Sequence, residues 1–407
     1  MLPDNWKQNT AIFIACQSTS LFGSSLVQYA IFWHITLTTQ SGVYATLYIL
    51  FGVLPTFFLS PMGGVWADKY DRKRLIVISD GCIALATLGL AILLLTGYNN
   101  IWFMLATAGL RALGAAVQQP AINAMLPDMV PPDQLTRVNG INGTMQSVVN
   151  LASPMLSGAL LSFMPINLIF FIDVSTATIS IAIMMLFFVS PVRKAPVNSG
   201  GYFSDLRMGL AYIAHNRYLR TFFIIYAVFM FVVAAPGMLS PLQVARTYGA
   251  DAWRLMVIEV SFSAGMVVGG LIMSSWGGWK NRLTTMAVST MAMGVLTFFL
   301  GVGIGFWPYM ALVVIIGIAL PLQSTASTIF LQENVDSAYM GRVFGIMMMI
   351  SSSFMPMGML LMGPLADKIA IEWLMLVTGI AIALLSLIFV LDKDLHKRGL
   401  NRREKPS

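Results

Sequence analysis

The sequence has little charge and few cysteines, and each shortage excludes a class of protein. Charged residues make up 10% of the chain and hydrophobic residues 57%, whereas a soluble domain is about 25% charged. The chain therefore has too few charges to cover a water-facing surface. Its two cysteines, Cys16 and Cys82, both lie in apolar stretches, which argues against a disulfide framework.

Long apolar stretches, in contrast, are abundant. A helix needs about 18 apolar residues to cross a bilayer, and we predict twelve such helices, six in each half of an all-α membrane protein. Most connectors are short, and the one long connector, residues 191–218, falls near the centre of the chain. The predicted spans are 11–38, 42–66, 74–97, 100–126, 137–162, 166–190, 219–243, 254–276, 283–304, 307–332, 342–366 and 370–391.

Lys and Arg are distributed unevenly between the two sides of these spans. The connectors on the same side as the C-terminal tail, together with the tail itself, hold most of them. The connectors on the other side hold only Arg246, Arg254 and Lys368. Because positively charged loops stay cytoplasmic, both termini are predicted to be cytoplasmic. The predicted domains are a six-helix half (1–190), a cytoplasmic linker with an amphipathic helix (191–218), a second six-helix half (219–391) and a basic cytoplasmic tail (392–407).

One stretch of the sequence occurs twice. LPDMVPPDQLTRVNGI begins at Leu126, and LQENVDSAYMGRVFGI begins at Leu331, 205 places later and without a gap. The first copy joins predicted spans 4 and 5, and the second joins spans 10 and 11 on the same side of the membrane. This parallel repeat of six plus six helices is the arrangement of the two halves of major facilitator transporters. A duplicated channel or scaffold is the alternative.

The connector between spans 2 and 3 reads GGVWADKYDRKRL. It resembles the cytoplasmic signature of the major facilitator superfamily, in which a glycine, an acid and a basic cluster follow in order. Asp68 would accept hydrogen bonds from backbone N–H groups or from an arginine. Such a cluster could act as a gate that latches one half to the other in one conformational state and releases it in the next. The alternative is that the Lys and Arg residues only enforce membrane topology. The matching loop of the second half has no acid, so the gate would be one-sided. The predicted gating residues are Gly64, Asp68, Arg72, Lys73, Arg74 and Arg342.

Ionisable residues inside the predicted spans are the candidates for proton coupling. An unpaired charge in a membrane costs several kcal/mol and usually marks a pathway. Arg111 lies near the middle of span 4, Asp80 and Asp173 lie within spans 3 and 6, and Glu259 lies near the outer end of span 8. An acid poised between burial and a nearby arginine could bind and release a proton in each cycle. Structural ion pairing, or a snorkelling position for Glu259, is the alternative.

Polar side chains recur in spans 1, 4, 7 and 10. Gln17, Ser24 and Gln28 form one helical stripe in span 1, and a polar stripe in a membrane helix should face protein or water. If these four spans line a cavity, as they do in the superfamily, the cavity is large, amide-rich and aromatic. Its predicted lining residues are Gln17, Ser24, Gln28, Gln118, Gln119, Asn123, Tyr226, Met230 and Gln323.

The whole chain resembles bacterial drug exporters of the major facilitator superfamily, most closely the macrolide-efflux proteins. The likeness includes the segments VLPTFFLSPMGGVWADKYDRKRL and PAINAMLPDMVPPDQLTRVNG. It implies proton-driven efflux of a bulky amphipathic small molecule across the bacterial plasma membrane by alternating access, with protons and membrane lipid as the other partners. A siderophore or lysophospholipid transporter is the alternative within transport, and a polytopic membrane enzyme or a channel is the alternative outside it.

Several motifs are missing from the sequence. There is no HExxH, no GxSxG, no Walker A loop and no cluster of His or Cys ligands, so we expect no enzyme, no metal and no cofactor. Without a nucleotide site, uphill transport needs an ion gradient or a partner ATPase. The net charge of +7 is explained by membrane topology, and we expect no nucleic-acid partner.

Overall fold

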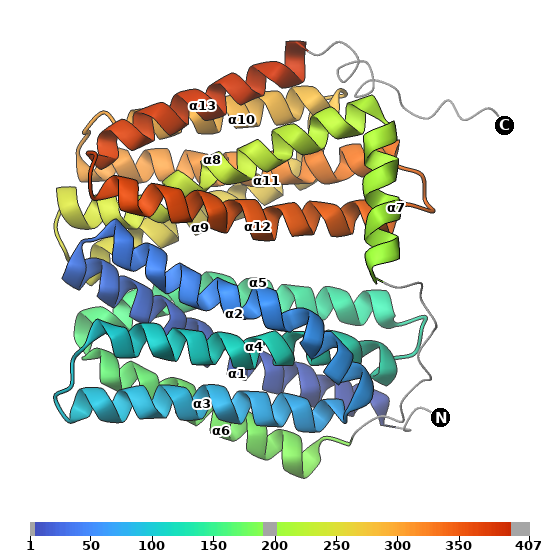
Figure 1. Ribbon diagram of the computed structural model, residues 1–407, viewed down its shortest axis with the longest axis vertical. Helices are drawn as coiled ribbons and strands as arrows, with labels where there is room; N and C mark the ends of the chain where they lie inside the picture. Colours follow the sequence, from blue (N-terminus) through green and yellow to red (C-terminus); the bar gives the residue numbers. More distant parts are fainter. Residues whose placement is uncertain (1–4, 190–201, 392–407) are drawn as a thin grey trace. The chain divides into compact units, whose positions relative to one another are not determined.

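The structure is a computed structural model that describes residues 5–189 and 202–391. In these two ranges the chain forms thirteen helices (Figure 1). The first six are α1 (Trp6–Thr39), α2 (Gly42–Lys69), α3 (Arg72–Leu95), α4 (Ile101–Met129), α5 (Leu135–Phe163) and α6 (Ile166–Phe187). The others are α7 (Tyr202–His215), α8 (Arg217–Thr247), α9 (Ala252–Trp276), α10 (Arg282–Leu300), α11 (Phe306–Asn334), α12 (Met340–Ala366) and α13 (Ile371–Leu391).

The twelve predicted spans correspond to the twelve long helices, and the amphipathic helix predicted in the linker is α7. Within the described ranges, eleven of the long helices are apolar enough to cross a bilayer. The twelfth, α5, carries a series of amides at Asn139, Asn142, Gln146 and Asn150, which lowers its hydropathy. Residues 191–201 of the predicted linker, the last residue of the predicted first half (190) and the predicted tail, 392–407, lie outside the described residues.

Polar residues in the short connectors determine where several helices begin. The side chain of Asp71 accepts a hydrogen bond from the Arg74 amide at 2.9 Å at the start of α3. Asn281 does the same for the Leu283 amide at 3.0 Å at the start of α10. The first amides of a helix have no partner within it, and an Asp or Asn side chain supplies one.

Contacts divide the chain into two units. The first unit comprises Met1–Thr39, Leu47–Val197 and Asp251–Met256, and the second comprises Gln40–Thr46, Asn198–Ala250 and Val257–Ser407. In the first unit α1 packs on α5 and α6, and α3 packs on α4 and α6. In the second unit α8 packs on α12 and α13, and α10 packs on α11 and α13. The same packing therefore occurs in both units, and the predicted fold of two six-helix repeats is confirmed.

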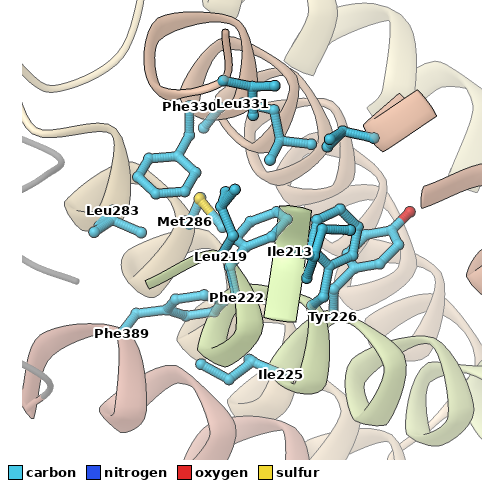
Figure 2. Close-up of a cluster of buried hydrophobic side chains, with 14 of the residues drawn as sticks. Ile213, Leu219, Phe222, Ile225, Tyr226, Leu283, Met286, Phe330, Leu331 and Phe389 are labelled. Atoms are coloured by element: carbon cyan, nitrogen blue, oxygen red, sulfur yellow. The ribbon is translucent and has the colours of Figure 1, made fainter. Parts of the chain in front are cut away.

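Helix α7 packs on the second copy of the repeated stretch. Its Ile213 is buried in an apolar cluster with Phe222 of α8, Met286 of α10 and Phe330 of α11 (Figure 2). The ring of Tyr212 on α7 stacks on Tyr339, with centroids 4.4 Å apart. The Tyr212 hydroxyl also donates to Asp336 Oδ2 at 3.1 Å. The linker helix thus belongs to the core of the second unit.

Candidate transport site

A cavity of about 400 Å³ lies within the first unit. Its volume falls in the usual range for small-molecule sites, about 300–1,000 Å³. Five of the predicted cavity residues line it: Gln17, Ser24, Gln28, Gln118 and Gln119. Further polar lining residues are Ser18, Ser20, Ser25, Tyr48, Thr56, Arg111, Asn142 and Gln146. Six of the lining residues carry side-chain amides, and we therefore call it the amide cavity.

Asn142 and Gln146 were not among the predicted lining residues. They come from α5, whose predicted span, 137–162, holds none of the predicted cavity residues. Residues four places apart lie on the same face of a helix, so the two amides form one polar patch that faces the cavity. The signal in the sequence was this amide spacing within an otherwise apolar stretch.

The other predicted cavity residues lie elsewhere. Asn123 is exposed and does not line the amide cavity. Tyr226, Met230 and Gln323 belong to the second unit. There the Tyr226 hydroxyl shares a hydrogen bond with Ser351 Oγ at 2.7 Å, and Met230 packs against the cluster of Figure 2. Gln323 is buried and donates to Ser327 within α11.

An ion pair is buried at the wall of the amide cavity. Arg111 Nη1 of α4 lies 2.5 Å from Asp173 Oδ2 of α6, and both side chains are buried. Thr87 Oγ1 of α3 donates to the same carboxylate oxygen at 2.9 Å and accepts a hydrogen bond from Arg111. Arg111 Nη2 donates to the Ser24 carbonyl of α1 at 3.0 Å, and Ser24 Oγ donates to Asp173 Oδ1 at 3.2 Å. These residues form the Arg111 site, in which each charge is compensated.

A glycine allows α1 and α6 to come together beside this pair. A Cβ atom added to Gly23 would lie 2.0 Å from Thr176 Oγ1 and 3.0 Å from the Asp173 Cα. Any larger residue would therefore push α6 away from α1 and move Asp173 away from Arg111.

A second carboxyl is buried without a cation. Asp80 of α3 is 2% exposed, and its Oδ1 accepts hydrogen bonds from Ser20 Oγ at 2.7 Å and from Gln118 Nε2 at 2.6 Å. Both donors are neutral, and both line the amide cavity, whereas Asp80 does not. Among the described residues, no Lys or Arg forms an ion pair with Asp80. These three residues form the Asp80 site.

The Arg111 site and the Asp80 site each take one residue from α1, one from α3 and one from α4. The two residues on α3 are seven positions apart, as are the two on α4, which is about 10 Å along a helix axis. The two residues on α1 are four positions apart. The corresponding residues are Ser20 and Ser24 on α1, Asp80 and Thr87 on α3, and Gln118 and Arg111 on α4. One cavity is therefore bordered by a neutralised ion pair and by a carboxyl held only by neutral donors.

Arg72, a predicted gating residue, is the first residue of α3 and joins three segments of the first unit. It donates to the Ala67 carbonyl at 3.0 Å and to the Ala124 carbonyl at 2.7 Å, and it pairs with Asp128 at the end of α4. Asp68 lies 3.6 Å from Arg72 and its side chain is 66% exposed. Asp128, and not Asp68, is thus the main acidic partner of Arg72.

The second unit repeats this arrangement. Arg282 is the first residue of α10 and donates to the Gly277 carbonyl at 2.8 Å, five residues earlier, as Arg72 does to Ala67. Its acid is Glu333 at the end of α11, at 3.4 Å. Asp128 and Glu333 are equivalent positions of the repeated stretch. The loop before α10 has no acid, as the sequence shows, and the acid that pairs with Arg282 comes from the repeated stretch. Whether the gate is one-sided stays a prediction.

The remaining predicted gating residues, Gly64, Lys73, Arg74 and Arg342, do not take part in the ion pairs of Arg72 and Arg282. A Cβ on Gly64 would meet nothing within 4 Å, whereas one on Gly63 would lie 2.4 Å from the Ala116 carbonyl, so the close approach of α2 to α4 occurs at Gly63. Lys73 Nζ donates to the Phe188 carbonyl at 2.7 Å, just after α6. Arg74 is exposed. Arg342 donates to the Ala338 carbonyl at 3.4 Å and lies 5.7 Å from the Tyr339 ring centroid.

Glu259, the remaining coupling candidate, lies apart from these sites. It is half-buried on α9 in the second unit and does not line the amide cavity.

A charged cluster that the sequence analysis missed lies in the second unit. Asp367, just after α12, accepts hydrogen bonds from Ser41 Oγ at 2.6 Å, from the Gly42 amide at 2.7 Å and from the Val43 amide at 3.0 Å. Arg246 Nη2 pairs with it at 2.6 Å. Burial raises the pKa of Asp367, but these hydrogen bonds outweigh burial and leave its pKa below the ordinary value. The carboxylate is therefore charged at neutral pH and caps the start of α2.

The Arg111–Asp173 pair makes a prediction for folding. Arg111→Gln or Asp173→Asn alone should lower the yield and thermal stability of folded protein, because breaking a buried pair costs about 3–5 kcal/mol. The double variant should recover most of this loss, since neither charge is left alone. The measurement is the melting temperature of detergent-purified protein, with the Asp80→Asn/Arg111→Gln double variant as the control that should not recover. Strict additivity in the first double variant contradicts the pairing.

Comparisons with known proteins agree with this architecture. The sequence model of the Major Facilitator Superfamily matches residues 10–359. Macrolide efflux protein A of Streptococcus pyogenes is 28% identical over 400 residues, which cover 98% of this chain and 99% of that protein. The staphyloferrin A transporter of Staphylococcus aureus is 22% identical over 387 residues, 93% of this chain and 95% of that protein.

Solved structures show the same fold. A bacterial homologue of the human lysosomal transporter Spinster matches with a TM-score of 0.67 and 14% identity, covering 100% of both chains. At this identity the match shows the fold alone. Together with the family match over most of the chain, it identifies a multi-pass membrane protein that belongs to the Major Facilitator Superfamily of transporters.

Proposed function

We propose that this transporter exports bulky amphipathic molecules of macrolide-like character across the bacterial plasma membrane in exchange for protons, with both termini cytoplasmic. The observation that carries the proposal is the amide cavity, which offers many neutral donors and acceptors beside an unpaired carboxyl. A large neutral or basic molecule with hydroxyl and carbonyl groups suits such a wall. The near full-length similarity to a macrolide efflux protein supports the same substrate class.

The charge of the cavity supports this substrate class over the main alternative. One relative is named a staphyloferrin A transporter, and transport of a siderophore or a lysophospholipid is the second candidate. A ligand rich in carboxylates needs free cations in its site. The positive charge of Arg111 is already matched by Asp173, which favours a neutral or basic ligand over a polyanion.

Proton exchange is proposed as the energy source. The candidates that would carry the proton are Asp80, Asp173 and Glu259, with Arg111 as the charge that tunes them. Of these, Asp80 and the Arg111–Asp173 pair adjoin the amide cavity. A group that loses its proton beside a bound ligand links the two binding events.

Vesicle transport tests the coupling. In inside-out vesicles from an efflux-deficient bacterium that expresses this protein, an acid-inside gradient should drive accumulation of radiolabelled erythromycin in the lumen. With one proton per substrate, each pH unit corresponds to about tenfold accumulation. A protonophore should abolish it, and vesicles without the protein are the control. Uptake that follows sodium or ATP, or that ignores every gradient, contradicts proton exchange. Accumulation of a ferric siderophore instead of erythromycin contradicts the substrate class.

We propose that the charged clusters around Arg72 and Arg282 act as gates. Substitutions of two aspartates, Asp68 and Asp128, distinguish a role in gating from a role in folding. Asp68→Asn should slow transport while folded protein accumulates normally, because this side chain is exposed. If the Asp68 carboxylate stabilises one conformational state by about 1.4 kcal/mol, its loss shifts the equilibrium between the two states about tenfold. We therefore expect transport to slow by about that factor. Asp128→Asn should lower the yield of folded protein, because it leaves Arg72 without its main acid.

The measurement compares erythromycin transport per folded molecule, with folded protein quantified by gel filtration. An Asp68→Asn variant that transports at the wild-type rate removes Asp68 from the gate.

A further inference from the structure

We propose that Asp80 is the proton-carrying carboxyl of this transporter, and that Ser20 and Gln118 transmit its protonation to the amide cavity. The inference rests on the proposed proton-driven export and assigns the coupling to one residue. Asp173 and Arg111 are then a fixed pair that holds α1, α3, α4 and α6 together. The hydrogen bonds, burial and spacing of the two sites carry this assignment.

The two buried carboxyls differ in what stabilises their charge. Asp173 has a guanidinium at 2.5 Å and two hydroxyl donors, so taking up a proton would break an ion pair inside the membrane. Asp80 has two neutral donors, both on one of its oxygens. Protonation of Asp80 therefore removes an uncompensated charge without leaving a partner unpaired.

The other titratable groups around Asp80 lie on the helices that pack near it. The helices that pack most extensively on α3 are α4 and α6, and α1 reaches it through Ser20. Among the described residues, the titratable groups that interact electrostatically with Asp80 are Asp173 on α6, which is paired with Arg111 of α4, and the buried thiol of Cys16 on α1. Arg111 and Asp173 compensate each other, and the thiol is neutral when protonated. The Asp80 carboxylate thus carries the net charge of this part of the unit.

The position of Asp80 explains how a proton could affect a ligand that does not touch it. Asp80 lies behind the cavity wall, and its two donors form part of that wall. A carboxylate only accepts hydrogen bonds, so Ser20 and Gln118 must both direct their hydrogens toward it. A protonated Asp80 can itself donate, which frees one of these side chains to turn toward the cavity. The hydrogen bonds offered to a ligand therefore depend on the proton, and by linkage the ligand changes proton affinity equally.

Infrared difference spectroscopy tests the assignment without a substrate. Exposed carboxyls also take up protons as the pH is lowered, so the Asp80 signal is the carboxyl C=O component that purified wild-type protein in lipid shows and Asp80→Asn lacks. Asparagine keeps the size of the side chain and an acceptor oxygen for both donors. This component should persist in Arg111→Gln/Asp173→Asn and in Asp133→Asn, which removes an exposed carboxyl. An Asp80→Asn spectrum identical to that of the wild type overturns the proposal, as does a component lost only in the Arg111→Gln/Asp173→Asn variant.

The pH midpoint of the same infrared band tests the role of Ser20 and Gln118. Ser20→Ala and Gln118→Met each remove a hydrogen bond to the charged carboxylate, and such bonds favour the charged form. The pH at which the band is half-formed should therefore rise in both variants. The pH profile of erythromycin accumulation should move in the same direction. An unchanged band midpoint in both variants contradicts the transmission through Ser20 and Gln118, because a purely structural role would alter yield without moving it.

Vesicle transport separates a failure of this proposal from a failure of the proposed function. If wild-type protein shows no accumulation in an acid-inside gradient, proton-driven export itself is wrong. If the wild type accumulates erythromycin and Asp80→Asn does so equally, only the assignment to Asp80 is wrong. The proposal expects Asp80→Asn to lose gradient-driven accumulation and still to equilibrate erythromycin down its own concentration gradient.

Discussion

The buried ion pair between Arg111 and Asp173 is the interaction on which the first unit depends. A charge inside a membrane protein is tolerated only when it is paired and hydrogen-bonded. Here the pair draws its bonds from α1 and α3 in addition to the two helices that carry it. This requirement fixes the mutual register of four helices. It also determines the chemistry of the cavity, because a cation that is already compensated does not attract anionic ligands.

Pairing of charges also accounts for the acid that recurs in the sequence repeat. The repeated stretch carries an acid at the end of the fourth helix of each half, and each acid pairs with the arginine that begins the third helix. In both halves that arginine also binds the carbonyl five residues before it. Each of the two copies, which lie 205 residues apart, therefore supplies the acid of an ion pair that joins the third and fourth helices of its own half.

Much of the fold could be predicted from the sequence because the bilayer imposes it. Long apolar stretches have few alternatives to spanning helices, and the repeat shows how they are grouped. Five cavity residues could be found, three from their polar spacing on α1 and two on α4 from the resemblance to the superfamily. Choices among partners could not be predicted: nothing in the sequence says that Arg111 pairs with Asp173 and not with Asp80. That choice depends on helix packing, as does the pairing of Arg72 with Asp128 instead of the nearby Asp68.

Two signals in the sequence were present but not used. Asn142 and Gln146 lie four residues apart in the most polar of the long helices, which is the pattern of a cavity-facing stripe. Thr87 lies seven residues after Asp80, on the same face of α3, and binds the ion pair. Polar residues at helical spacing in a membrane helix indicate shared sites, even when each residue alone is unremarkable.

We propose that one cavity binds a macrolide-like ligand and exchanges it for a proton. The most direct test is proton release on ligand binding, measured by adding erythromycin to purified protein in weakly buffered detergent solution. We expect binding to release protons when the starting pH leaves the coupling carboxyl protonated, and to release none at alkaline pH. Erythromycin that binds without releasing protons at any pH, or that does not bind at all, would contradict proton exchange at this cavity.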